Sequence, residues 1–432
     1  MRKTLMVVAL AFALGASPAA AAPAAVATPL SLDGAIAVAL AHNLDYGIAQ
    51  TKVDASVAQL LQARAPLAPN VALQDNYQYV NNIAKLSTPF GPIPFSSVDA
   101  TNIPLAVMQY TLFDGGLTAA RVGQAAAALS AAQANVHQAR ASVIESTSKA
   151  YYDLVEAQQM SDVASRAANV AQAHVVQARQ LLGSGMIPRA DLLRAQAELA
   201  SRQVDLIGAQ NGVSLAQVTL DDVLNVPLST VYAPTDTLQG SVPHVDLDRL
   251  LTSAHAARGE LAAARFSVQA ARAAVDAARS GNVPHVNAVI SDGNTQPAVV
   301  GGYHNQFSVG LSAVWTLFDN GYTAGRVAQA RAGVHEAELG VQKMQNNIDL
   351  QVRKAYLDMG QAQAQTVAAR RAVDLNDENL RLAELRYRGG VGTALELQDA
   401  ELRDRDARMQ LTQAQASLRQ SVVELRYAAG LL

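Results

Sequence analysis

Apolar residues recur every seven positions in two long stretches of the chain, residues 117–182 and 322–387. This spacing predicts helices that pack side by side, and neither stretch contains a proline that would interrupt a helix. At a rise of ~1.5 Å per residue, each helix would be about 100 Å long. The heptad positions are Val122, Leu129, Val136 and Val143, then Val327, Val334, Val341 and Ile348. The intervening positions are rich in Ala and Gln, which favours helices in water over helices in lipid.

Shorter helical segments flank each long one. Residues 32–64 and 191–225 flank the first, and residues 247–279 and 396–430 flank the second. The two short segments of each set add up to nearly the length of the long one. We therefore expect two short helices, stacked end to end, to lie along each long helix.

Strand patterns lie between the first short helix and the long helix of each set. Near residue 310, apolar and mostly polar residues alternate over about ten positions, the length that a barrel wall requires. The apolar positions are Phe307, Val309, Leu311, Ala313 and Trp315. The predicted strands are residues 70–83, 100–112, 285–296 and 305–317. Prolines at 89, 92 and 94 around Gly91 indicate a loop between the first two strands.

The chain contains one structural unit written twice. Tyr110-Thr111-Leu112-Phe113-Asp114-Gly115-Gly116 is echoed by Trp315-Thr316-Leu317-Phe318-Asp319-Asn320-Gly321, and the echo continues at a constant offset through both long helices. Duplication explains this better than chance. We predict a first structural repeat over residues 23–235 and a second over residues 236–432, each with two strands and a set of long and short helices.

The first 22 residues have the pattern of a secretory signal peptide. Arg2 and Lys3 precede an apolar stretch of about ten residues, and small residues end at Ala22. No later apolar run approaches the ~20 residues of a spanning helix, so a membrane role would have to use strands. The chain has no cysteine to accept a lipid anchor, and its net charge of -3 gives no basic surface for nucleic acid.

Four strands are too few to close a barrel, because the smallest closed barrels have about eight. A strand edge cannot face lipid with unpaired backbone groups. The barrel must therefore be shared between chains. Strand arithmetic alone does not fix their number, since both three and four copies would close a barrel.

The chain resembles the TolC family of outer-membrane factors along its whole mature length. The resemblance rests on the duplicated strand-to-helix motif and on two helical tips, Gly185-Met186-Ile187-Pro188-Arg189-Ala190-Asp191 and Tyr387-Arg388-Gly389-Gly390-Val391-Gly392-Thr393. It implies a homotrimer with a twelve-stranded β-barrel in the outer membrane, joined to a periplasmic α-helical barrel. It also implies a periplasmic adaptor (membrane fusion) protein and an inner-membrane pump or ABC transporter as partners.

Two acidic residues mark the joints between strand and long helix. Asp114 and Asp319 precede the long helices, where a carboxylate can accept backbone N–H groups and complement the helix dipole. Neighbouring glycines allow the sharp turn. The expected structural joints are Phe113, Asp114 and Gly116, with Phe318, Asp319 and Gly321 in the second copy.

Four residues near the tips are candidates for a periplasmic gate. Glu396 and Asp399 lie three residues apart on one helix face, where they are either ordinary acidic residues of a first turn or, as the resemblance implies, rings of carboxylates that select cations. The resemblance also implies that Asp191 and Tyr387 latch the entrance. The basic partner that the family has between Thr393 and Glu396 is missing here.

The tip glycines imitate a phosphate-binding loop only superficially, because no Lys-Ser/Thr pair follows and no strand precedes. They predict helix-to-helix turns, and the resemblance makes them the adaptor-docking tips: Gly185, Met186, Gly390, Val391 and Gly392. The eight histidines show no metal-binding spacing, and no catalytic constellation is evident. We expect no cofactor, no metal and no enzyme activity.

The leading functional hypothesis is a passive outer-membrane export conduit of a tripartite efflux pump, as in multidrug resistance, or of a type I secretion system. A structural or adhesive coiled-coil protein of the envelope is the alternative. It would explain the long helices but not four amphipathic strands inserted at matching places in the two copies.

Overall fold

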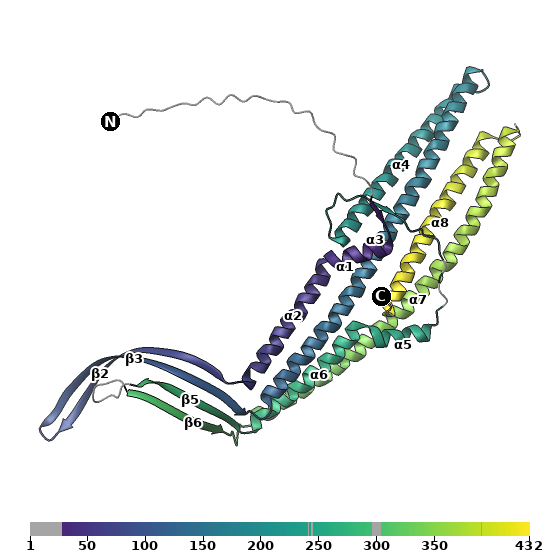
Figure 1. Ribbon diagram of the computed structural model, residues 1–432. Coiled ribbons are helices and arrows are strands. Elements are labelled where there is room, and N and C mark those ends of the chain that lie inside the picture. The colour runs from purple at the N-terminus through teal and green to yellow at the C-terminus, as the bar shows by residue number, and fades with distance from the viewer. Residues whose placement is uncertain (1–27, 241, 243–244, 296–303, 390) are drawn as a thin grey trace, which may run out of the picture.

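The computed structural model describes residues 28–240, 242, 245–295, 304–389 and 391–432. The expected signal peptide lies outside the described residues. All long strands lie at one end of an elongated molecule, and the helices run away from them as a bundle (Figure 1). The mostly helical fold with a strand-built end agrees with the predicted fold class.

The first copy is built around α3 (Leu117–Gly183), a helix of 67 residues. Two shorter helices, α2 (Leu44–Arg64) and α4 (Arg189–Leu224), pack along it one after the other. A short helix, α1 (Leu32–His42), precedes α2 and also packs against α3.

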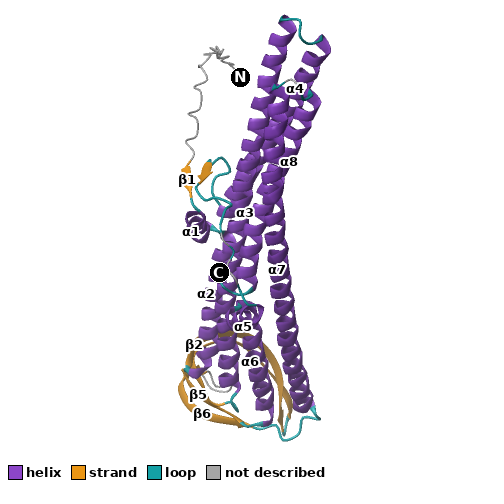
Figure 2. Cartoon of the chain, turned by 90° about the vertical axis from the view of Figure 1, so that its right-hand side faces the viewer, coloured by secondary structure: helices purple, strands orange, loops and turns teal. Residues whose placement is uncertain are grey.

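The second copy repeats this arrangement around α7 (Tyr322–Arg388), which also has 67 residues. Here α6 (Gly259–Arg279) and α8 (Ala394–Ala428) lie along the long helix, and α5 (Leu247–Ala257) precedes α6. The two copies are joined along α3, which contacts both α6 and α8. Figure 2 shows both long helices running along the length of the bundle. Within the described residues, none of the helices combines the length and the apolar composition needed to cross a bilayer.

The prediction of single helices over residues 32–64 and 247–279 was wrong, because both are broken near their first third. Asn43 has extended backbone angles, and its side chain caps the next helix by accepting the N–H groups of Asp45 and Tyr46. At the equivalent break, the buried Arg258 donates to the carbonyl oxygen of Tyr427 at the end of α8.

The break at Arg258 also brings two helix backbones together. A Cβ on the next residue, Gly259, would lie 2.3 Å from the carbonyl oxygen of Ala134 on α3. Only glycine therefore allows α6 to begin this close to α3.

The main sheet has four antiparallel strands in the order β2-β3-β5-β6. Their bounds are β2 Asn70–Thr88, β3 Gly91–Phe113, β5 His285–Thr295 and β6 His304–Val314. The predicted strands 70–83 and 100–112 were too short, since pairing continues to Thr88 opposite Gly91. The expected loop shrinks to a turn at Pro89 and Phe90, where Gly91 has a φ of 110°. β6 ends at Val314, before the predicted end at residue 317.

Smaller elements complete the fold. Strands β1 (Thr28–Leu30) and β4 (Tyr232–Pro234) pair in parallel beside α1. Two 3₁₀ turns, η1 (Ala65–Leu67) and η2 (Ser280–Asn282), follow α2 and α6.

The apolar core lies where the short helices meet, halfway along the bundle. One cluster surrounds Tyr151 on α3, and the other surrounds Ile348 on α7. The Tyr151 hydroxyl lies 2.9 Å from the carbonyl oxygen of Leu30 and 2.8 Å from Asp236 Oδ2. Burial and the neighbouring Asp236 carboxylate raise the pKa of Tyr151 to about 12. These contacts tie β1 and the segment after β4 to the long helix.

Candidate functional site

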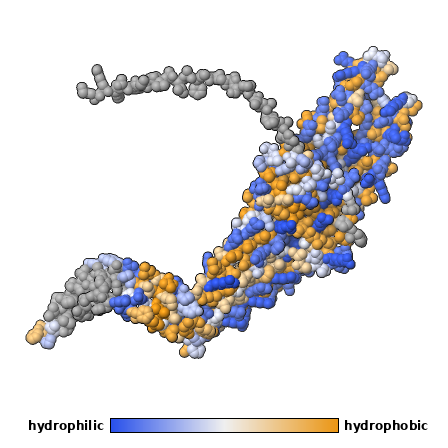
Figure 3. Space-filling view, viewed as in Figure 1, coloured by the Kyte–Doolittle hydropathy of each residue, from blue (hydrophilic) through white to orange (hydrophobic). Residues whose placement is uncertain are grey.

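The register of the sheet places apolar side chains on one face across all four strands. Directly paired residues point to the same face, and one such row contains Val71, Met108, Ile290 and Val309. The next row outward contains Leu73, Ala106, Asp292 and Phe307. Val71, Leu73, Phe307 and Val309 are exposed in the single chain. Apolar residues are visible over the half of the sheet nearest the helices in Figure 3.

The opposite face of the sheet carries polar groups. Gln109 pairs with Asn70, Thr111 pairs with Asn287, and the hydroxyls of Ser291 and Ser308 lie 2.6 Å apart. A sheet with one apolar and one polar face fits a wall between lipid and water.

Each joint between strand and long helix is held by one carboxylate. Asp114 accepts the backbone N–H of Thr118 at 2.6 Å, and Asp319 accepts that of Thr323 at 2.7 Å. Partial burial opposes ionisation of Asp114, but hydrogen bonds from Thr118 and the N–H of Gly116 outweigh it and hold its pKa below the usual value. The hydrogen bonds from Thr323 lower the pKa of Asp319 in the same way.

The glycines at the joints allow the turn of the backbone, and the phenylalanines expose apolar surface beside it. Gly116 has a φ of 87° and Gly321 a φ of 85°, a conformation that side chains rarely adopt. Phe113 and Phe318 expose half or more of their surface at the end of the sheet. The structure thus gives each predicted joint residue a place at the turn from strand to helix.

The two helical hairpins end in exposed tips at the far end from the sheet. We use "tips" for residues 183–189 between α3 and α4 and residues 388–394 between α7 and α8. Gly185 has a φ of 76°, and the following Met186 exposes 68% of its surface. In the other tip, Val391 is 75% exposed and Gly392 donates its N–H to the carbonyl oxygen of Arg386. Gly390 lies outside the described residues.

The four candidate gate residues lie in the helices that adjoin these tips, on two different hairpins. Asp191 is in the first turn of α4, with Arg194 at 3.4 Å. Tyr387 lies in the last turn of α7 and is half-buried. Within one chain the tip of α3 and α4 stands apart from the tip of α7 and α8 (Figure 1). The structure therefore does not bring Asp191 and Tyr387 together within a chain.

Glu396 and Asp399 each have a local partner. Glu396 forms a capping box with Thr393: its N–H donates to the Thr393 hydroxyl, and its carboxylate accepts the Thr393 N–H. Asp399 lies 3.0 Å from Arg403 on the same helix. Both carboxylates thus stabilise the first turns of α8. Among the described residues, no three His, Cys, Asp or Glu side chains gather as a metal site requires.

The outermost strands and helices of the chain pack against the rest of the chain on one side only. β2 and β6 are the two edge strands of the sheet. Among the helices, α2 and α4 pack against α3 on one side, and α7 packs against α6 and α8 on the other. Large apolar side chains remain exposed on these outer helices: Ile48, Val57 and Leu61 on α2, Val204, Ile207 and Leu215 on α4, and Leu350, Leu357 and Leu375 on α7.

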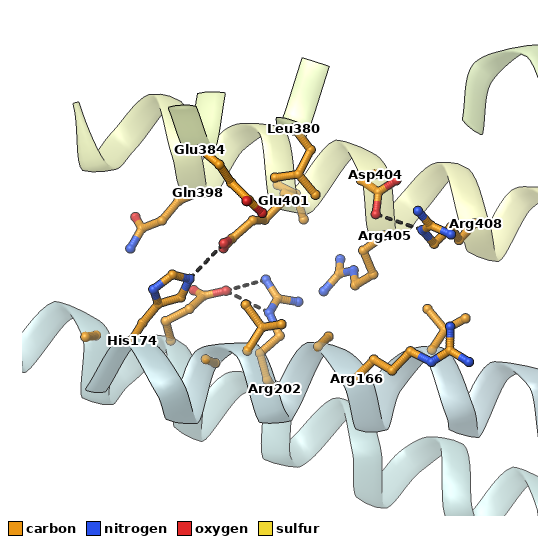
Figure 4. Close-up of a pocket in the computed structure, with 17 residues that line it drawn as sticks. Arg166, His174, Arg202, Leu380, Glu384, Gln398, Glu401, Asp404, Arg405 and Arg408 are labelled. Carbon is orange, nitrogen blue, oxygen red and sulfur yellow. Dashed lines mark hydrogen bonds and ion pairs between the residues drawn. The ribbon is translucent and has the colours of Figure 1, made fainter. Parts of the chain in front are cut away.

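One candidate site was not predicted from the sequence. A cavity of about 360 Å³ lies between the two hairpins, lined by α3, α4, α7 and α8. His174 on α3 and Glu401 on α8 point toward each other across it, with Nε2 and Oε1 2.7 Å apart (Figure 4). Nothing in the local sequence distinguishes His174 from the other histidines, because its partner is 227 residues away.

Comparisons with known proteins cover nearly the whole described chain. The profile described as "Outer membrane efflux protein" matches residues 35–226 and 250–431. Protein CyaE of Bordetella pertussis is 27% identical over 93% of this chain and 84% of its own length. The pyoverdine export outer membrane protein OpmQ of Pseudomonas putida is 28% identical over 90% of this chain and 84% of its own length. The solved structure of the outer membrane protein VceC of Vibrio cholerae shares the fold, with a TM-score of 0.77, 20% identity and coverage of 92% of this chain and 96% of that one.

Proposed function

The chain belongs to the outer membrane efflux protein family, and on that basis we propose that three copies join side by side into one export duct. The family consists of outer-membrane channels that extend into the periplasm and serve efflux pumps or type I secretion, and this chain is such a channel. We assign it the role of a passive conduit with no catalytic step.

The observation that supports a barrel shared between copies is the sheet with one apolar face and two open edges, and the number three follows from the family resemblance. In lipid, each unpaired N–H or C=O group on an edge strand would cost several kcal/mol. Pairing β6 of one copy with β2 of the next satisfies both edges, and three copies supply twelve strands around an open lumen. The exposed apolar side chains of α2, α4 and α7 support lateral packing of the helices in the same ring.

A direct test is the mass of the detergent-solubilised chain by native mass spectrometry. We expect three copies per particle, and membrane extraction that requires detergent. A well-folded monomer would contradict the proposal, and release from membranes by salt alone would favour an adhesive coiled-coil protein instead.

We assign the gate to contacts between neighbouring copies. In a closed ring, α4 of one copy lies beside α7 of the next. That arrangement places Asp191, at the start of α4, near Tyr387, at the end of α7, in the adjacent copy. We call the ring of six tips the mouth of the duct. Glu396 and Asp399 would repeat three times around this mouth and favour cations.

We assign the docking of a periplasmic adaptor to the same tips. Met186 and Val391 are exposed apolar residues on short turns, which suits a small apolar contact with a helical partner. The inner-membrane pump or ABC transporter would deliver cargo through that adaptor. Replacing Met186 with Asp should abolish co-purification with the adaptor, while the trimer remains intact. Unchanged co-purification would remove Met186 from the interface.

A further inference from the structure

The seam between α3 and α8 holds the two hairpins of one chain together. Near the middle of the bundle, Gln420 on α8 donates to Asp153 on α3 at 2.5 Å. Closer to the tips the next link between these helices is His174 with Glu401, at 2.7 Å. Among the described residues, it is the last side-chain link between α3 and α8 before the tips. The hairpins end as separate tips beyond it (Figure 1).

The cavity lies along the seam on the side of this link that faces the middle of the bundle. Helix packing is thus interrupted there, and side-chain contacts set the spacing of the hairpins. A second contact joins the hairpins beside the cavity, from Arg405 on α8 to Asp205 on α4 at 3.3 Å. The histidine link differs from this arginine–aspartate contact, because its charge depends on the protonation of His174.

Charged side chains of both signs line the cavity beside His174. The acidic ones are Glu401 and Asp404 on α8, Glu384 on α7 and Glu198 on α4, and the basic ones are Arg166 on α3, Arg202 on α4, and Arg405 and Arg408 on α8. Arg202 is itself engaged by Glu198, at 2.6 Å, and by Asp205. The hydrogen bond to Glu401 raises the pKa of His174, against the effect of its partial burial, and the charge of Glu384 adds to the rise.

We propose that the His174–Glu401 contact is a proton-controlled clasp that holds the two hairpins of each copy together and thereby narrows the mouth of the duct. The proposal rests on the duct function proposed above. Protonated His174 attracts Glu401 as a charged pair, and neutral His174 keeps at most a hydrogen bond. The clasp therefore adds a regulatory contact within each chain, separate from the latch between neighbouring copies.

The direction of the pH response follows from linkage. A histidine with a raised pKa in the clasped state binds its proton more tightly there than in the open state. The clasp is therefore strongest below the pKa of a free histidine, about 6.5, and weakens as pH rises through the raised value. The ratio of open to clasped states changes by at most about tenfold per pH unit for each chain.

Conductance of the purified trimer in planar bilayers between pH 5 and 9 tests the clasp. Wild-type conductance should rise with pH on the alkaline side of 6.5, and His174→Gln should remove this step. His174→Lys keeps a positive charge and should hold the low conductance throughout. His137→Gln, at an exposed histidine on the same helix, is the matched control and should behave as wild type.

A distance measurement separates the clasp from other titrating groups at the mouth. Since the chain contains no cysteine, spin labels at Ser184→Cys and Arg388→Cys, in copies diluted with unlabelled chain, report the spacing of the two tips. The spacing should widen with pH in the wild-type background and not with His174→Gln. A pH response that persists with His174→Gln, or that is absent from the wild type, would overturn the clasp. Absence of any channel would instead overturn the duct.

Discussion

The carboxylates of Asp114 and Asp319 accept hydrogen bonds in matching positions of the two copies. Each takes the N–H of the residue four positions later, from Thr118 and Thr323, and each takes the N–H of a glycine at 3.0 Å. These contacts fix where a strand in lipid becomes a helix in water.

Replacing Asp114 with Ala should lower the free energy of unfolding by about 1 kcal/mol, because two N–H groups lose their acceptor. Asp114→Asn, which keeps an acceptor, should lose less. Since the pKa of Asp114 is lowered in the folded state, its contribution should be complete above about pH 4 and disappear as pH falls through the lowered value. Denaturant titrations in detergent at several pH values measure this difference.

A charge on the apolar face of the sheet should prevent membrane insertion. Val309→Arg, in the row with Ile290, should cost roughly 2 to 4 kcal/mol at the middle of the bilayer. Ser308→Arg is the matched control, because its side chain lies on the polar face. Heat-resistant trimer in outer-membrane fractions measures insertion, and equal yields from the two variants would mean that the faces are assigned the wrong way round.

The double variant Glu396→Gln with Asp399→Asn should weaken cation selectivity and block by multivalent cations. Because Glu396 also belongs to a capping box, Thr393→Ala is the necessary control: it breaks the cap and leaves both charges. Single-channel reversal potentials distinguish the two effects. If Thr393→Ala reproduces the loss of selectivity, the two acids only start the helix.

Removing the latch should open the mouth. Asp191→Ala and Tyr387→Phe should each raise conductance and let large antibiotics into cells, since each deletes one side of a contact between copies. Arg194→Ala is a control, because it removes only the partner of Asp191 within its own helix. Conductance that stays at the wild-type level in both latch variants would remove the latch from the mechanism.

The sequence predicted what local patterns encode. Proline-free heptads predict helices over 117–182 and 322–387, and α3 and α7 occupy Leu117–Gly183 and Tyr322–Arg388. The alternation near Val309 likewise predicts the apolar face that the register then extends over four strands.

What the sequence missed depends on distant partners. The break at Arg258 is stabilised by a carbonyl oxygen 169 residues away, and no local pattern marks an arginine for that role. The helix break at Asn43 was easier to predict, because asparagine is a common N-cap. It was missed because the apolar pattern continues past this residue. The link from His174 to Glu401 needs the packing of two hairpins before it exists at all.

The staggered lengths of the helices have a mechanical consequence. The gaps between successive short helices lie beside α3 or α7. These two helices are continuous from the strand joints to the tips. A pull exerted on the tips is thus carried as axial tension along continuous hydrogen-bonded helices and reaches the membrane at Asp114 and Asp319. Because each gap between the shorter helices lies beside a continuous helix, this line of tension has no break along the helical part of the tube.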